Sequence, residues 1–413
     1  MTDETEENVY RNKKCVKNLK ITSFFIVSFI GFFALFSSTM SKSPILPLFA
    51  KSLITSEFEM QFIGYVFAAS TVPGILVSMI AGRLSDMYGR RKLILVSTII
   101  FASAPFFYLF AINIWILMII RFYHGFSTAI FVPVAMAAIA ESYPDNKGKY
   151  LSSFSSITLV GRFLAPITGG AILFITTNYY YGVYIGCAIS GAIALTLTVF
   201  FYRDRIPQTQ LKLNQTTERP SLTIKEFVRG IKEVLTHKII LSTSIVQASQ
   251  YFAFGIIEAY VILYANSLHF DAWLIGLIPA ILTLMLVGVN PLMGYLSDKV
   301  GRRLIILVGL LLGGSVSWMI PFATNYIWVI LILCGFGIGM AMVVSSTTAY
   351  VSDLSKKEDY GSAIGTLSTI MDIGQTIGPI LSGYVLLAFS FGGVFLMVSI
   401  VLIASVLIFY IIK

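Results

Sequence analysis

A ten-residue segment rich in glycine and charge occurs twice in this chain, at positions separated by about half its length. The first copy, G-R-L-S-D-M-Y-G-R-R, occupies 82–91, and the second, G-Y-L-S-D-K-V-G-R-R, occupies 294–303. Each copy separates two long apolar segments. The two copies are 212 positions apart, and Glu141 and Asp353 are separated by the same number of positions. The repeat predicts two homologous bundles of helices joined in tandem and related by an axis along the membrane normal.

The composition indicates that these bundles lie in a membrane. Hydrophobic residues make up 57% of the chain and charged residues only 12%, whereas a soluble domain has roughly a quarter of its residues charged. Apolar runs of about 20 residues recur, and each is long enough to cross a bilayer core of ~30 Å. The sequence predicts an all-α polytopic membrane protein with twelve transmembrane helices, near 21–49, 60–82, 93–112, 115–141, 151–175, 180–202, 238–265, 271–295, 304–323, 326–352, 361–388 and 391–412.

The positive charges indicate the orientation. Most of the 29 Lys and Arg residues lie in the tails and alternate loops, whereas the opposite loops contain only Lys51. By the positive-inside rule, both termini are expected in the cytoplasm. The predicted organisation is a cytoplasmic tail, a six-helix bundle, a cytoplasmic linker and a second six-helix bundle, at 1–20, 21–203, 204–237 and 238–413.

The linker carries an amphipathic pattern. Ile224, Phe227 and Ile231 share one helical face, and Lys225 and Arg229 share the other. This pattern predicts a helix lying on the inner leaflet. Two roles stay open for it: a spacer that tethers the bundles, and a regulatory or partner-binding segment.

Several classes of function lack their sequence signatures. The net charge of +9 follows the loop asymmetry, so a nucleic-acid partner is not expected. There is no Gly-rich phosphate loop with its Lys-Ser/Thr, so ATP is not expected as the energy source. No spacing of metal ligands or catalytic nucleophiles occurs either. The sequence therefore predicts no enzyme activity, no cofactor and no metal.

The repeated segment has the form G-x-L-S-D-x-x-G-R-R, which resembles the signature loop of the major facilitator superfamily. The six-plus-six layout fits that family over nearly the whole chain. The resemblance implies alternating access around a central cavity, with this loop as a cytoplasmic gate. It also implies contacts from Asp86 to the helix at 361–388, and from Asp298 to the helix at 151–175, when the cytoplasmic side is closed.

The gate has a physical rationale. Glycine permits a tight turn, and Arg90 and Arg91 can reach acids such as Glu141. The alternative is that the charges serve only to fix topology. The expected gate residues are Gly82, Asp86, Gly89, Arg90, Arg91, Glu141, Gly294, Asp298, Gly301, Arg302, Arg303 and Asp353.

A second motif lies in the helix at 151–175. It is similar to the G-x-x-x-G-P-x-x-G-G pattern of the drug:proton antiporter branch, with alanine replacing one glycine, and a related copy lies in the helix at 361–388. Small residues allow close helix packing, so we expect both copies at the interface between the bundles. Packing alone would explain the motif, whereas the resemblance implies efflux. Its residues are Gly161, Ala165, Pro166, Gly169, Gly170, Gly374, Gly378, Pro379 and Gly383.

Ionisable side chains at bilayer depth are functional candidates because each costs at least ~2.5–3.5 kcal/mol to insert. Arg121-x-x-His124-Gly125 resembles the family's R-x-x-Q-G pattern, with histidine in place of glutamine, and this resemblance implies an influence of the arginine on proton transfer. The candidates for the substrate and proton pathway are Lys42, Arg121, His124, Arg162, Glu258 and Asp372.

The roles of these charges stay open in part. Glu258 is the preferred coupling residue, because an acid that meets a cation in only one state would switch protonation. The alternative is a static Lys42–Glu258 bridge. Asp372 can form a local hydrogen bond, and Arg162 can either neutralise Asp372 or bind an anion. His124 can either titrate near neutral pH or form a stable hydrogen bond in the interior.

The sequence thus favours a monomeric, proton-coupled antiporter of the cell membrane that exports small hydrophobic or amphipathic compounds, as in multidrug efflux. A carrier of a sugar, organic acid or other metabolite is the first alternative. From different classes, a lipid flippase or scramblase and a transport-inactive sensor also stay open.

Overall fold

The structure, a computed structural model, describes residues 23–177, 179–203, 238–354 and 360–411, and these are helical almost throughout. The predicted tail and the predicted linker helix lie outside the described residues. The first part of the chain contains a helix at 23–42, then α2 (Ile45–Ser52), η1 (Glu57–Gln61), α3 (Phe62–Ala69), α4 (Val72–Tyr88), α5 (Arg90–Phe107), η2 (Tyr108–Phe110), α6 (Ile114–Ser142), η3 (Pro144–Asn146), α7 (Lys147–Ile175) and α8 (Tyr180–Phe200).

The second part repeats this pattern of long helices with short connections. It contains α11 (Lys238–Ser267), α12 (Ala272–Val300), α13 (Arg302–Met319), η4 (Ile320–Phe322), α14 (Tyr326–Leu354) and α15 (Tyr360–Ile411).

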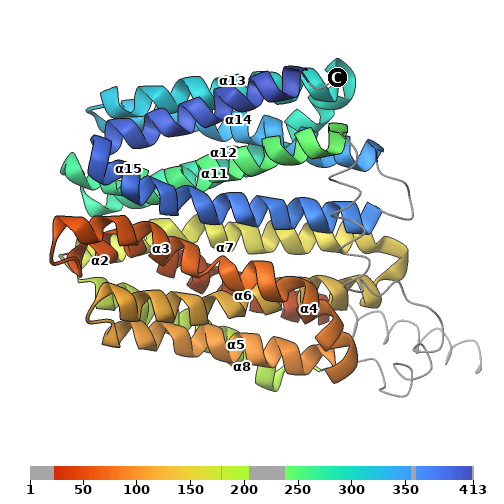
Figure 1. Cartoon of the computed structure of the whole chain (residues 1–413). Helices are drawn as coiled ribbons and strands as arrows, with labels where there is room; N and C mark the ends of the chain where they lie inside the picture. The colour runs from red at the N-terminus through yellow and green to blue at the C-terminus, as the bar shows by residue number, and fades with distance from the viewer. Residues whose placement is uncertain (1–22, 178, 204–237, 355–359, 412–413) are drawn as a thin grey trace, which may run out of the picture.

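Within the described residues, 11 helices are long and apolar enough to cross a membrane. Their ends agree with the predicted spans to within a few residues at most positions. The two predicted spans at 361–388 and 391–412 both fall within α15, which has 52 residues and a non-helical residue, Ser390, between its two arms. Figure 1 shows the chain reversing there, so that the arms run in opposite directions.

Two predicted spans are interrupted. The helix at 23–42 ends before Pro44, and α3 and α4 are separated at Ser70 and Thr71, just before Pro73. Proline has no backbone N–H to donate to the preceding turn and its ring crowds that turn, so an unbroken helix is disfavoured at both places. The predicted span near 60–82 is thus a membrane-crossing segment, Glu57–Ser78, that contains a break.

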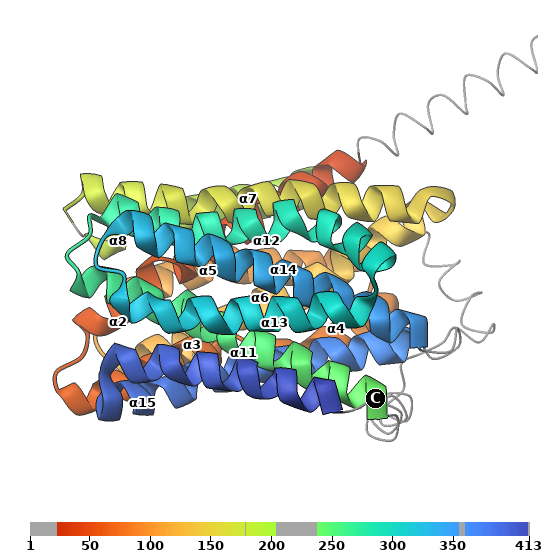
Figure 2. The same cartoon turned by 90° about the horizontal axis from the view of Figure 1, so that it is seen from above.

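The long helices lie side by side and nearly parallel (Figures 1 and 2). In the first part α5 packs on α6 and α8, and α4 packs on α6; in the second, α11 packs on α15, and α14 packs on α12 and α13. These two parts of the chain are its first and second half. They meet where α7 packs on α12 and where α3 packs on α15. The α4–α5 turn and the α12–α13 turn lie at the same end of the molecule (Figure 1).

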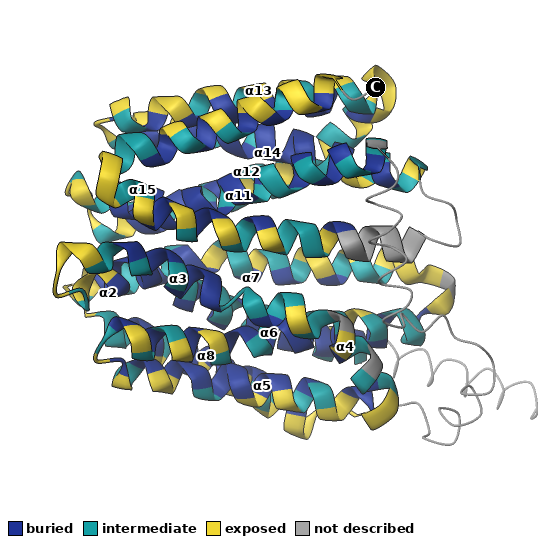
Figure 3. Ribbon diagram, in the orientation of Figure 1, coloured by how far each residue is buried: buried dark blue, intermediate teal, exposed yellow. Residues whose placement is uncertain are grey.

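Exposed residues occur along the length of the helices (Figure 3). Many of them are large and apolar, for example Ile119, Leu331 and Ile400. A contiguous apolar exterior is rare on a soluble monomer but is the surface expected against lipid. The exterior therefore agrees with the membrane location that the composition predicts.

Candidate functional site

The two charged turns, 82–91 and 294–303, have the same backbone geometry. α4 ends at Gly89, with φ of 96°, and α12 ends at Gly301, with φ of 106°. Glycine adopts positive φ without the steric cost that other residues incur. Because of this reversal, Arg90 and Arg302 stand as the first residues of α5 and α13.

Arg90 organises the first charged turn. Its Nε donates to Glu141 Oε2 at 3.3 Å, and its Nη2 donates to Glu141 Oε1 at 2.6 Å. Its Nη1 donates to the carbonyl of Gly82 at 3.2 Å, and the guanidinium also bonds Ser85 Oγ and Asp86. Paired N–H···O bonds between a guanidinium and a carboxylate are among the stronger protein hydrogen bonds, so they hold the turn to the end of α6.

Arg302 reproduces these contacts in the second charged turn. Its Nε donates to Asp353 Oδ2 at 3.1 Å, its Nη1 donates to Ser297 Oγ at 2.8 Å, and it pairs with Asp298. Every partner lies at the sequence offset that relates the two copies. The repeat recognised in the sequence is thus a repeat of side-chain contacts.

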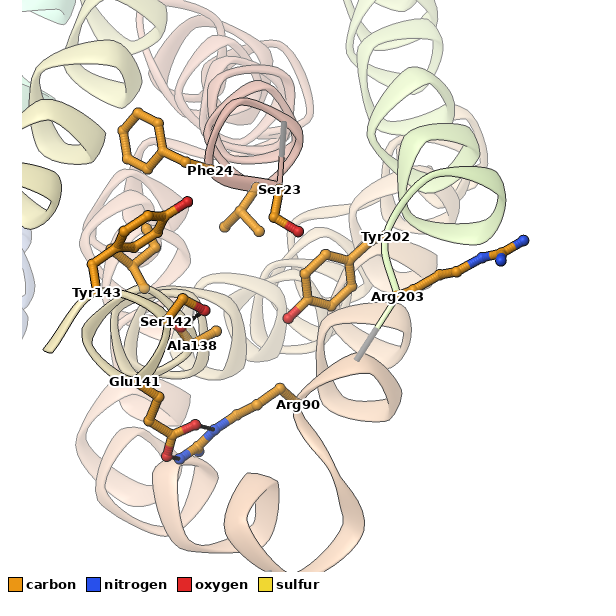
Figure 4. A pocket seen from close by; sticks show the side chains of 11 residues that line it. Ser23, Phe24, Arg90, Ala138, Glu141, Ser142, Tyr143, Tyr202 and Arg203 are labelled. Carbon is orange, nitrogen blue, oxygen red and sulfur yellow. Dashed lines mark hydrogen bonds and ion pairs between the residues drawn. The ribbon is translucent and has the colours of Figure 1, made fainter. Parts of the chain in front are cut away.

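The first turn is the more enclosed of the two. The side chain of Glu141 is 24% exposed, whereas that of Asp353 is 55% exposed. Figure 4 shows Arg90 and Glu141 facing one another at the edge of a pocket. That pocket lies at the end of the charged turns, far from the interior charges, and is lined by Ser23, Phe24, Val27, Arg90, Ala138, Ile139, Glu141, Ser142, Tyr143, Tyr202 and Arg203.

The second arginine of each turn binds the end of another helix, a role that the sequence analysis missed. Arg91 Nη2 donates to the carbonyl of Val199 at 3.0 Å. Arg303 Nη2 donates to the carbonyls of Phe409 and Tyr410 at 3.2 and 2.7 Å. The last carbonyls of a helix have no partner within it and carry partial negative charge, so each arginine fastens the final helix of its half to the turn.

The contacts predicted for a closed cytoplasmic gate remain a prediction. Among the described side chains, Asp86 and Asp298 pair with arginines of their own turns, and no hydrogen bond or ion pair joins either of them to α15 or α7.

The small-residue motif divides between two interfaces. On α7, a Cβ added at Gly170 would lie 2.8 Å from the Cα of Gly276 on α12, across the interface between the halves, whereas Gly161 packs against Phe32 of its own half. On α15, Gly383 meets the backbone of Gln61 across that interface. The expectation that the whole motif lies between the halves is therefore wrong for Gly161, Gly169, Gly374 and Gly378, which pack within their own halves.

Lys42 and Glu258 form an ion pair between the two halves. The Nζ–Oε2 distance is 2.6 Å, and the side chains are 19% and 13% exposed. Lys42 is the last residue of the helix at 23–42, and Glu258 lies in the last third of α11. Among the described residues, no other ion pair joins the halves.

Arg121 and His124 lie in a separate buried cluster within the first half. Arg121 Nη1 donates to Tyr108 Oη at 3.1 Å, and Nη2 donates to Ser70 Oγ at 2.9 Å. Tyr108 Oη lies 3.1 Å from His124 Nδ1. Because the hydroxyl accepts from Arg121, its own proton is free to be donated to His124. The break between α3 and α4 supplies Ser70, and neither Tyr108 nor Ser70 had a signal in the sequence.

Arg162 and Asp372 are placed differently from the other interior charges. Both residues are only partly buried, and within the described part of the chain no hydrogen bond or ion pair is made by either of their side chains; the Thr376 hydroxyl donates to the backbone carbonyl of Asp372 at 2.7 Å. Each interacts electrostatically with the phenol of Tyr251 on α11, and Arg162 also interacts with Glu258. Of the two roles left open for Arg162, a direct ion pair with Asp372 is therefore not formed in this conformation.

Comparisons with known proteins agree with this architecture. A family model described as Major Facilitator Superfamily matches residues 27–343 and 274–413. The multi-drug resistance efflux pump PmrA homolog of Lactococcus lactis is 25% identical over 87% of this chain and 88% of that protein. The multidrug resistance protein MdtG of Salmonella arizonae is 26% identical over 89% of this chain and 90% of that protein. Among solved structures, nucleoside transporter NupG has a TM-score of 0.77 at 14% identity, with 96% of this chain and 99% of that chain covered, which is a similarity of fold.

Proposed function

Because the chain belongs to the major facilitator superfamily, we propose that it exports small amphipathic compounds across the cell membrane in exchange for protons. In this proposal, twelve membrane helices form two six-helix halves, at 21–203 and 238–413, and both termini face the cytoplasm. The halves rock about a shared site, which opens to each side of the membrane in turn.

The direction of transport rests on the relatives. One relative is named as a multi-drug resistance efflux pump and another as a multidrug resistance protein, and both align with nearly nine-tenths of this chain. The similarity to a nucleoside transporter concerns the fold alone and gives no comparable support to uptake of a metabolite. We therefore propose efflux of amphipathic compounds, and not uptake of a metabolite, as the activity of this protein.

The contacts between the halves support an inward-open state for this conformation. Among the described residues, the hydrogen bonds that join the halves lie away from the charged turns: Lys42–Glu258, Lys51–Asn266, Tyr65–Tyr384 and Thr71–Thr376. At the other end, a Cβ added at Gly82 or Gly294 would meet nothing within 4 Å. If the charged turns are cytoplasmic, as the positive-inside rule predicts, the external side is closed.

The Lys42–Glu258 ion pair is the observation that carries the proposed coupling. The pair spans the closed interface, so its partners must separate when the external side opens. A carboxylate that loses its cation while it remains shielded from water is stabilised by taking up a proton. Glu258 would then bind a proton from outside and release it when the pair forms again.

Transport in proteoliposomes under an imposed pH gradient tests this role. Glu258→Gln should abolish accumulation driven by the gradient, while movement down a substrate gradient continues. Lys42→Gln serves as the matched control, because it breaks the same bridge but leaves the acid. It should retain driven accumulation at a lower rate. Unchanged accumulation in Glu258→Gln would remove this residue from the mechanism, and equal loss in both variants would favour a static bridge.

A further inference from the structure

Arg162 on α7 is an interior cation whose side chain forms no direct ion pair with a described residue, although it interacts electrostatically with Glu258. Lys42 is held by Glu258 at 2.6 Å. Arg121 is 3% exposed and is bonded by Tyr108 and Ser70. By contrast, the guanidinium of Arg162 makes no hydrogen bond with the described residues, although it lies deep in the bundle with some of its surface accessible. A charge held at this depth without a partner is costly unless it binds a counter-charge.

Asp372 on α15 is the corresponding anion on the opposite half. Its side chain also has no described hydrogen-bonding partner and is partly accessible. Gly74 of α4 stands beside it, because a Cβ added there would lie 3.8 Å from Asp372 Oδ2. Gly74 itself therefore places no side chain next to this carboxylate.

The phenol of Tyr251 on α11 lies within electrostatic range of both charges, Asp372 and Arg162. Tyr251, Phe254 and Glu258 are the partly accessible residues on this stretch of α11, and their neighbours 252, 253, 255, 256 and 257 are buried. This spacing of three and four residues defines one helical face. The Tyr251 and Phe254 rings lie 6.1 Å apart and form an aromatic wall on it.

We propose that Arg162 and Asp372 are the two poles of a binding site for zwitterionic aromatic compounds, with Tyr251 and Phe254 as the wall between them. The guanidinium binds the acidic group of the ligand, and the carboxylate binds its basic group. Planar, bidentate geometry makes arginine well suited to a carboxylate. The site lies between the halves, so the proposal rests on the transport pathway proposed above and names its substrate class.

Equilibrium binding to the purified protein at a single pH tests the site. The probes share one fluorescent ring: 1-naphthylalanine is the zwitterion, 1-naphthylacetate the anion, 1-naphthylmethylamine the cation and 1-naphthylacetamide the neutral form. The wild-type protein should bind 1-naphthylalanine about tenfold or more tightly than any of the other three, a factor that corresponds to about 1.4 kcal/mol.

The variants should divide the probes by charge. Arg162→Gln should weaken the binding of 1-naphthylalanine and 1-naphthylacetate about tenfold and leave the binding of 1-naphthylmethylamine unchanged. Arg162→Lys should restore part of the lost affinity. Asp372→Asn should weaken the binding of 1-naphthylalanine and 1-naphthylmethylamine and leave the binding of 1-naphthylacetate unchanged. Retained binding of the spared probe also shows that each variant is folded.

Two results would overturn the proposal. One is equal affinity of the wild-type protein for all four probes. The other is uniform weakening of all four in Arg162→Gln, which indicates a structural role. Because no proton gradient is involved, these results are separate from the test of Glu258: coupling can fail while the charge preference holds, and the preference can fail while coupling holds.

Discussion

At the scale of single residues, Tyr108 holds together the buried cluster of the first half. Its hydroxyl accepts from Arg121 and lies within hydrogen-bonding distance of His124 Nδ1, both at 3.1 Å. Tyr108→Phe would leave both groups buried with one partner fewer, at a cost of about 1–3 kcal/mol for each group left unsatisfied. We expect a clear fall in the thermal unfolding midpoint, measured in detergent.

Tyr123→Phe is the matched control for this substitution. Its hydroxyl on α6 bonds Ser103 Oγ of α5 at 2.9 Å, at a position that is only partly buried. The control should lower the midpoint much less. A similar loss in both variants would show that the Tyr108 hydroxyl does not support the cluster.

The same residues show how far the sequence could define the interior. Depth and charge type marked Lys42, Arg121 and Glu258 as candidates, because any ionised side chain in an apolar run is conspicuous. Their partners depend on which helix faces are turned toward each other, which a single sequence does not encode. Tyr108 gave no signal, since a tyrosine near a helix end equally suits the membrane interface.

At the scale of elements, the two charged turns allow the same ion-pair contacts to be compared at two degrees of exposure to solvent. Both have the same contacts, but the Arg90 side chain is 11% exposed and that of Arg302 is 20% exposed, and the acid paired with Arg302 is mostly in solvent. Arg90→Gln should cost about 2–3 kcal/mol, because it leaves Glu141 without its paired bonds. Arg302→Gln should cost about 1 kcal/mol or less, as for an exposed pair.

Unfolding of both variants in denaturant, compared with the wild-type protein, measures this difference. Equal losses of unfolding free energy would indicate that the shared backbone turn determines the stability and that burial of the ion pair has no effect on it. A larger loss in Arg302→Gln would contradict the argument from burial.

The helices themselves were largely predictable because length and apolar content alone define a membrane span. The reversal at Ser390 falls between two predicted spans. The break before Pro73 was not anticipated, although proline gives a physical reason for it. The break matters because it frees Ser70 to bond Arg121. Breaks of this kind depend on local contacts as well as on the proline, since Pro166 lies inside an unbroken α7.

At the scale of the whole molecule, the repeat predicts two halves but not the way they are tilted. An outward-open and an inward-open arrangement would contain the same helices, so hydrophobic patterning cannot distinguish them. Among the described residues, the hydrogen bonds that join the halves lie away from the charged turns, which is the pattern that the proposed inward-open state requires. The free energy between such states is expected to be only a few kcal/mol, which a single protonation can offset.

Distances between spin labels across both ends of the protein test the rocking of the two halves most directly. One labelled pair, Met87 and Val300, lies at the charged turns, and the other, Phe58 and Phe322, lies at the opposite end; all four residues are exposed. Acidic pH, or Glu258→Gln at neutral pH, should shorten the Met87–Val300 distance and lengthen the Phe58–Phe322 distance. Changes of the same sign at both ends, or a change at one end alone, would contradict alternating access by this protein.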